Sequence, residues 1–173
     1  MARQGSLFSF PNPVNEVAAR VVAGGVLILA AMALTADLPV LLIPLAYGFW
    51  ARVLTGPTLS PLGQLATRVI APRLTVRPRL VPGPPKRFAQ GIGTVVTTAA
   101  VALWLTGNWW AAEVLLGMMV VFAFLESVLA ICVGCSIFGF LMRRGLIPES
   151  VCEECADISR RPPGLRAHST ASG

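Results

Sequence analysis

Four cysteines arranged as two C-x2-C pairs are the residues of this sequence best suited to chemistry. Cys132 and Cys135 lie in the apolar run FLESVLAICVGCSIFGFL, and Cys152 and Cys155 follow in VCEEC, which gives the spacing C-x2-C-x16-C-x2-C. Paired thiols can exchange disulfides with each other or with a partner protein, or can carry sulfur. Four thiolates at this spacing can also hold one zinc ion.

The expected surroundings of these cysteines do not favour reactive thiols. We expect Cys132 and Cys135 on one membrane helix, with Cβ atoms roughly 5–6 Å apart. Counting from Arg143 at the cytoplasmic boundary, they lie roughly 16 Å and 12 Å deep. An apolar setting raises a thiol pKa, and Glu153 and Glu154 disfavour a thiolate in the second pair. A metal would relieve both effects, although a tetrathiolate site with a net charge of about −2 is costly at that depth.

Three interpretations of the cysteines stay open. In the first, Cys132 and Cys135 are a buried dithiol that exchanges with the exposed pair Cys152 and Cys155, or with a soluble thioredoxin-like or rhodanese-like partner. In the second, all four hold one zinc ion in a non-enzymatic scaffold or small carrier, clamping the C-terminal segment. In the third, they only pack. Static disulfides are not expected, because the predicted topology places all four on the reducing side of the membrane.

Glu126 is a further candidate. An acid in the middle of a membrane helix is costly, which makes it a functional candidate for proton transfer or pairing. At 100° per residue it points away from Cys135. We expect it to be protonated, or paired with a hydroxyl or an arginine of another helix. A structural hydrogen bond and a role in proton transfer both remain open.

The composition is that of a membrane protein. Of 173 residues, 55% are hydrophobic and 13% are charged, about half the charged fraction of a soluble domain. A hydrocarbon layer of about 30 Å needs roughly 20 apolar residues per helix. We predict an all-α integral membrane bundle, with the lipid bilayer as its surroundings, within a membrane domain of residues 14–145. Its four transmembrane helices are expected at about 14–35, 38–54, 88–105 and 110–141.

The remaining segments are expected outside the hydrocarbon layer. Residues 1–13 form a polar leader. A short helix from Ser60 to Ile70 lies in the membrane interface between the second and third spans. The proline-rich stretch from Arg77 to Arg87 is an extended connector. Residues 146–156 are a cytoplasmic segment with two cysteines, and 157–173 are a disordered tail.

The basic residues predict the orientation. All 14 Lys and Arg fall in the leader and first turn, between the second and third spans, or after the fourth. The positive-inside rule therefore places both termini and the middle loop in the cytoplasm of a bacterial cell, with the protein in its cytoplasmic membrane. Arg20 and Arg52 lie near the inner boundary, where they can reach water. The basic loop lacks stacking aromatics, so we expect no nucleic-acid partner.

Three segments resemble a known family: PNPVNEVAAR in the leader, PKRFAQGIGT at the start of the third span and FLESVLAICVGC in the fourth. They are similar to the bacterial membrane family called domain of unknown function 4395, over roughly Asn12 to Cys155. The resemblance implies a multi-pass fold without an assigned activity, and singles out Arg87, Phe88, Glu126, Cys132, Gly134 and Cys135. It also implies thioredoxin-like or rhodanese-like partners, and hence thiol or sulfur chemistry.

Overall fold

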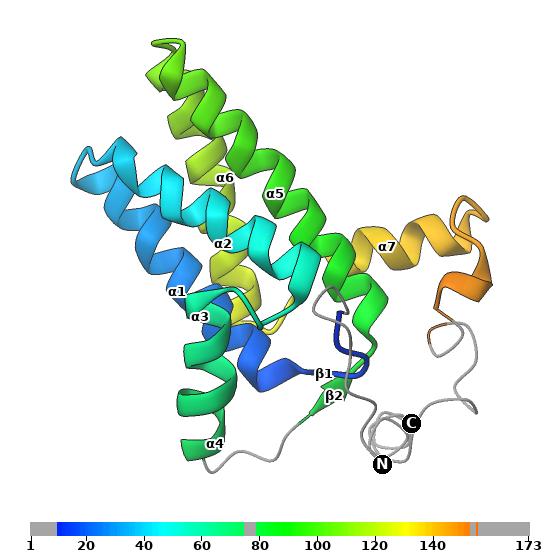
Figure 1. The fold of residues 1–173 in the computed structure, drawn as a ribbon. Coiled ribbons are helices and arrows are strands. Elements are labelled where there is room, and N and C mark those ends of the chain that lie inside the picture. The colour runs from blue at the N-terminus through cyan, green and yellow to red at the C-terminus, as the bar shows by residue number, and fades with distance from the viewer. Residues whose placement is uncertain (1–9, 75–78, 153–154, 156–173) are drawn as a thin grey trace.

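Helices account for most of the chain that the structure describes. The computed structural model covers residues 10–74, 79–152 and 155. The predicted tail at 157–173 and most of the leader lie outside these residues. Four long helices pack side by side (Figure 1). They are α1 (Glu16–Thr35), α2 (Leu42–Thr55), α5 (Gly83–Leu105) and α6 (Trp109–Ser127).

Three of these helices are long and apolar enough to cross a membrane: α1, α5 and α6. The second expected span is shorter, because a 3-10 turn at Pro39–Leu41 precedes α2. Large apolar side chains face outward, as a lipid environment requires. Ile28 is 61% exposed and Val95 is 69% exposed, while alanines such as Ala30 and Ala112 are fully buried. Small residues at helix contacts allow close packing in a bilayer, although the core also contains Leu42, Leu45 and Leu116.

The helices pack as two crossed hairpins. Helix α1 packs chiefly against α6, and α2 packs chiefly against α5, which also contacts α6. The α1/α2 and α5/α6 turns lie at the same end of the bundle, where Trp109 Nε1 donates a hydrogen bond of 3.0 Å to Asp37 Oδ1. Thr94 and Thr97 of α5 are also buried.

Helix α5 begins five residues earlier than predicted. Its first turn contains Pro84 and Pro85, which we had assigned to an extended connector. Proline is tolerated there because the first turn needs no backbone N–H donors. The Gly83 N–H is instead bonded to Asn12 Oδ1 at 2.8 Å, from the leader. This early start places Lys86 on a helix that faces the rest of the bundle.

Two short elements join the leader and the middle segment to the bundle. Strand β1 (Val14–Asn15) pairs antiparallel with β2 (Leu80–Val81). Residues Pro61–Arg73 form a continuous helical stretch made of α3 (Pro61–Gln64), a π-helical part at Leu65–Ile70, and α4 (Ala71–Arg73). The π-helical part ends two residues before Pro72, whose ring would clash with the carbonyl of Arg68 in a regular α-helix.

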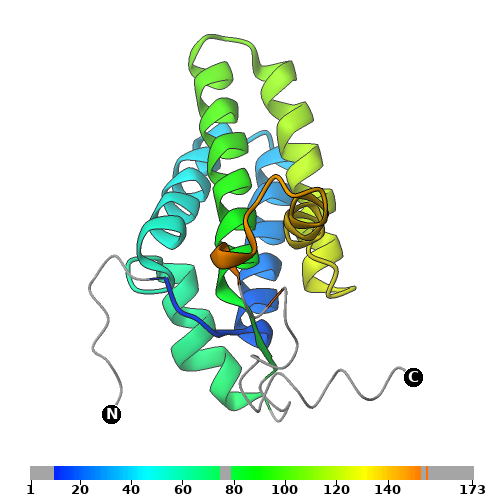
Figure 2. The same cartoon turned by 90° about the vertical axis from the view of Figure 1, so that its right-hand side faces the viewer.

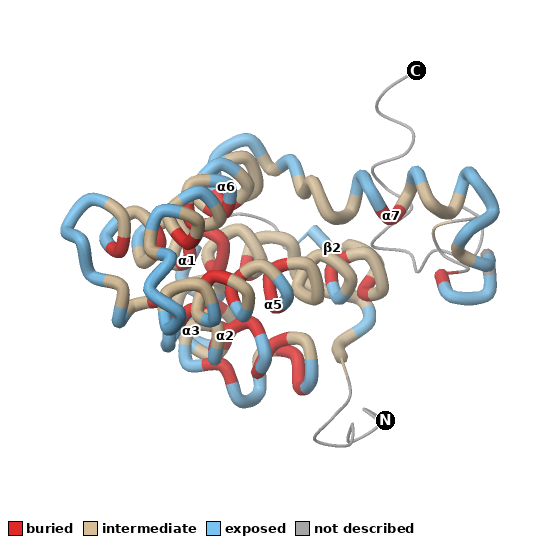
Figure 3. Tube along the Cα trace, turned by 90° about the horizontal axis from the view of Figure 1, so that it is seen from above, coloured by how far each residue is buried: buried red, intermediate tan, exposed pale blue. Residues whose placement is uncertain are grey.

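The fourth predicted span is two helices instead of one. Helix α6 ends at Ser127, and α7 (Val133–Arg143) runs at a large angle to it. Figure 2 looks nearly along α7, and Figure 3 shows it extending away from the bundle. With 11 residues, α7 is about 16 Å long, roughly half the thickness of the hydrocarbon layer. The prediction of one continuous helix at 110–141 is therefore wrong.

Candidate functional site

The break between α6 and α7 creates the site. Ala130 has a φ of +57°, and Ile131 N–H bonds to Leu125 O at 3.0 Å. A left-handed residue is a common way for a helix to end, but glycine normally occupies that position. An alanine there costs roughly 1 kcal/mol and removes the sequence signal for the break.

Cys132 is the N-cap of α7. Its backbone is extended, and its Sγ accepts a hydrogen bond of 3.4 Å from the Cys135 N–H. A helix N-terminus carries a partial positive charge that favours an anion, and a thiolate accepts hydrogen bonds better than a thiol does. The prediction that both cysteines lie deep within one continuous helix is wrong, because Cys132 precedes a new helix.

The two free thiols have different acidities. The hydrogen bond with the Cys135 side chain lowers the pKa of Cys132, and nearby Lys86 and the Cys135 N–H lower it further, whereas burial opposes them. The same thiol hydrogen bond raises the pKa of Cys135, and burial raises it more. Cys132 is thus the more acidic of the two thiols, and Cys135 is the less acidic one. The expected rise in thiol pKa holds for Cys135, whereas the hydrogen bond with Cys135 outweighs burial at Cys132.

Glu126 pairs with Lys86 of α5. Lys86 Nζ lies 2.7 Å from Glu126 Oε1, and the two side chains are 9% and 19% exposed. Both act electrostatically on Cys132. The expected partner was a hydroxyl or an arginine, and Lys86 was missed because the prolines before it indicated a connector. Interpreting Pro84 and Pro85 as the first turn of a helix would have placed Lys86 on α5.

Arg20 fixes the end of α6. Its guanidinium donates hydrogen bonds of 3.1 Å and 3.0 Å to Ser127 O and one of 3.1 Å to Val128 O. Carbonyls at a helix C-terminus have no partner within the helix and favour a cation. Arg20 thus holds α6 at the point where the chain turns toward Cys132. The side chain is half-buried, so these bonds do not contradict the expectation that it reaches water.

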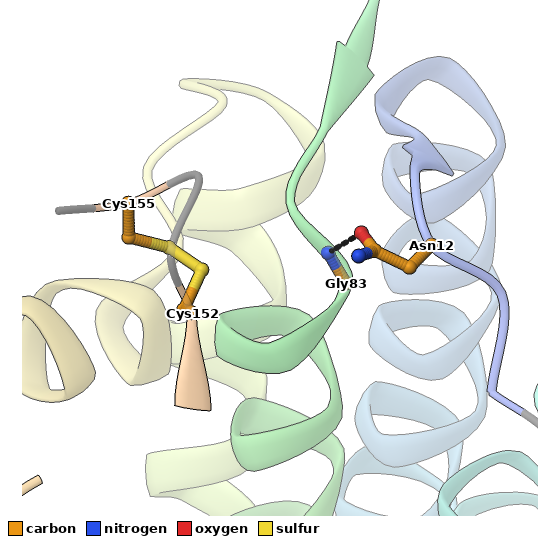
Figure 4. Close-up of a disulfide and its surroundings, with 4 residues drawn as sticks. All are labelled: Asn12, Gly83, Cys152 and Cys155. Atoms are coloured by element: carbon orange, nitrogen blue, oxygen red, sulfur yellow. Dashed lines mark hydrogen bonds between the residues drawn. A yellow bond between two sulfur atoms is a disulfide. The ribbon is translucent and has the colours of Figure 1, made fainter. Parts of the chain in front are cut away.

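Cys152 and Cys155 form a disulfide. Figure 4 shows it near the start of α5, where Asn12 is bonded to Gly83. Cys152 is 3% exposed, whereas Cys155 is half-buried. The expectation of no disulfide among the four cysteines is wrong for this pair.

One depression of about 800 Å³ is lined by both free cysteines and by one cysteine of the disulfide. Cys132 and Cys135 contribute to its wall, as do Lys86, Arg143 and Cys155. The residues do not fit a four-thiolate zinc site, because two of the sulfurs are bonded to each other. Within residues 10–74, 79–152 and 155, no three His, Cys, Asp or Glu side chains are grouped to hold a metal. The arrangement instead brings a dithiol and a disulfide to one surface.

Gly134 determines how closely α7 approaches α5. A Cβ added at Gly134 would lie 2.5 Å from Ala89 Cβ and 2.7 Å from Ala89 Cα. A Gly134→Ala substitution should therefore push α7 from α5, destabilise the protein by about 1–3 kcal/mol and slow alkylation of Cys132. Thermal unfolding and iodoacetamide kinetics in detergent measure both effects.

Gly139 provides the matched control on the same helix. A Cβ at Gly139 would meet nothing within 4 Å. Gly139→Ala should leave the alkylation rate unchanged and raise stability by about 0.5–1 kcal/mol, because alanine is the better helix former. Equal effects of the two substitutions would contradict the packing of Gly134 on Ala89.

Comparison with known proteins gives a family but no described activity. The profile of the family described as Domain of unknown function (DUF4395) matches residues 14–143, which include α1 to α7. No curated protein and no solved structure matches the chain. The match includes Lys86, Glu126, Cys132 and Cys135 but ends before the disulfide. Because it spans most of the sequence, the chain belongs to the DUF4395 family.

Proposed function

We propose that this protein exchanges thiols and disulfides at a membrane surface. The observation that carries the proposal is that free Cys132 and Cys135 line the same depression as Cys155 of the disulfide. The position of Cys132 at the start of α7 supports its role as the attacking thiolate. Cys135, whose pKa is raised, is suited to be the resolving thiol, which attacks the mixed disulfide in the second step.

The transfer has two steps. The Cys132 thiolate attacks Cys155 Sγ, forming a Cys132–Cys155 bond as the Cys152–Cys155 bond breaks, and its electron pair leaves on Cys152, which takes up a proton. Cys135 then loses its proton and attacks Cys132 Sγ, releasing Cys155 as a thiolate that is protonated in turn. Cys132 and Cys135 are oxidised by two electrons, and Cys152 and Cys155 are reduced by two.

Exposure indicates which sulfur is attacked. Cys155 lines the depression and is half-buried, whereas Cys152 is 3% exposed. Exchange requires access along the line of the breaking bond, so attack on Cys155 with Cys152 as the leaving group is favoured.

The proposal includes a place in the membrane. We assign the spans to α1, the Pro39–Thr55 segment, α5 and α6, with the Pro61–Arg73 helical stretch and α7 along the interface of a bacterial cytoplasmic membrane. The positive-inside rule supports a cytoplasmic location for both termini and for the site. A soluble thioredoxin-like or rhodanese-like protein would then exchange with the Cys152–Cys155 pair on that side.

Disulfide mapping of protein that carries one disulfide tests the proposal. Detergent-purified protein is fully reduced, freed of reductant and treated with one equivalent of dithiodipyridine. Samples are quenched with acid, alkylated and digested at intervals. We expect the disulfide to redistribute between the two pairs at a rate independent of protein concentration, because the transfer is intramolecular. A disulfide that stays where it first forms, or a rate proportional to protein concentration, would rule the relay out.

A further inference from the structure

A buried arginine without a counter-ion lies next to the dithiol. Arg52 is 5% exposed, in contrast to the expectation that it reaches water. Its Nε donates a hydrogen bond of 2.8 Å to Gln90 Oε1, and Nη1 donates one of 3.3 Å to Ser60 Oγ. The guanidinium also lies over the Phe49 ring, 4.5 Å from its centroid. Its Nη2 has no hydrogen-bond partner among the described residues.

The charge of Arg52 is not neutralised locally. In the described part of the chain the ion pairs are Arg79 with Glu16 and Lys86 with Glu126, so the nearby carboxylate of Glu126 is already paired. Arg52, Lys86 and Glu126 together leave one positive charge. A buried cation that lacks a partner is costly, and in a membrane protein such a residue marks a binding or transport site.

A cavity adjoins this arginine. It has a volume of about 80 Å³ and is lined by Arg52, Gln90, Glu126 and Cys132, with apolar side chains around the rest. One water molecule takes about 30 Å³ in the liquid, so the cavity has room for about two or three waters or a compact anion of similar size. A guanidinium N–H pair matches the oxygen spacing of an oxyanion.

We propose that this cavity binds a small, singly charged oxyanion, with the guanidinium of Arg52 and the amide N–H groups of Gln90 as donors. One negative charge neutralises the net charge of the three ionic side chains. Cys132 lines both this cavity and the larger depression, so the bound anion lies beside the thiol. The binding site does not depend on thiol exchange between the two cysteine pairs.

Nitrate is the probe, titrated against the purified full-length protein at constant ionic strength with chloride as the balancing ion. We expect saturable thermal stabilisation of the wild type. Arg52→Met should weaken the apparent affinity by about tenfold or more, because it removes the charged donor. Arg87→Met is the control. Arg87 lies near the same end of the bundle but is exposed, and its Nε is bonded to Val53 O, so this variant should keep the wild-type response.

Gln90→Glu is a second variant that supplies an internal anion to Arg52. It should remove the saturable response to nitrate while raising stability without nitrate, so the test holds even if Arg52→Met fails to fold. Absence of saturation in the wild type, or a wild-type response in Gln90→Glu, would overturn the proposal. Neither readout involves thiol transfer, so failure here is distinguishable from failure of the relay.

Discussion

Cys132→Ser should abolish disulfide transfer between the two pairs. A serine hydroxyl stays protonated at neutral pH, so the rate should fall by about two orders of magnitude or more. Cys135→Ser should behave differently, because Cys132 can still attack Cys155 but no thiol then resolves the product. It should accumulate the Cys132–Cys155 mixed disulfide, which non-reducing digestion and mass spectrometry detect as a cross-linked peptide.

Ser136→Ala is the control for these substitutions. Ser136 is exposed, follows Cys135 directly and uses its hydroxyl to bond Cys132 O at 3.1 Å. Its loss should change the transfer rate by less than about threefold, since a single exposed hydrogen bond contributes little. Transfer at the wild-type rate in Cys132→Ser would show that another thiol starts the reaction. A cross-link from Cys132 to Cys152 would reverse the assignment of the attacked sulfur.

The helical membrane architecture follows from the sequence because long apolar runs carry a strong signal. Helix α1 begins within two residues of the start predicted for the first span, with Asn15 as its N-cap, and α5 ends at Leu105 as predicted for the third. The prediction missed two helix boundaries: the start of α5, whose first turn contains prolines, and the end of α6, which is followed by an alanine with positive φ. Pro84 and Pro85 disfavour a helix interior but suit a first turn, and Ala130 is a strong helix former that here adopts a left-handed conformation.

The residues of the candidate site were selected from the sequence, but their local geometry was not. Cys132, Cys135 and Glu126 were selected from their types and spacing, yet their reactivity depends on the break at Ala130. Without that break, Cys132 would lie in a helix interior, where no free N–H groups stabilise a thiolate. Lys86 could not be found as the partner of Glu126, because the pairing depends on where α5 begins. Contacts between residues 40 positions apart depend on packing that local sequence patterns do not specify.

Lys86→Met should destabilise the protein more than any other single change to an ion pair of the described chain. The pair lies between α5 and α6 with side chains 9% and 19% exposed, so removing the ammonium leaves a poorly solvated carboxylate at Glu126. Breaking a buried pair in this way costs about 3–5 kcal/mol. Equilibrium unfolding in mixed micelles measures the change, and slower alkylation of Cys132 should accompany it, because Lys86 lowers that pKa.

The double substitution Lys86→Met with Glu126→Leu separates charge from shape. Replacing both partners with apolar side chains removes the isolated carboxylate, so most of the lost stability should return. Arg79→Met is the matched control, since Arg79 pairs with Glu16 at 3.1 Å but its side chain is 54% exposed. An exposed pair contributes about 0–1 kcal/mol, so this variant should unfold nearly as the wild type does.

Two outcomes would contradict the pairing. If Lys86→Met is no less stable than Arg79→Met, or if the double variant recovers none of the lost stability, Glu126 does not depend on Lys86. The electrostatic setting proposed for Cys132 would then need a different source.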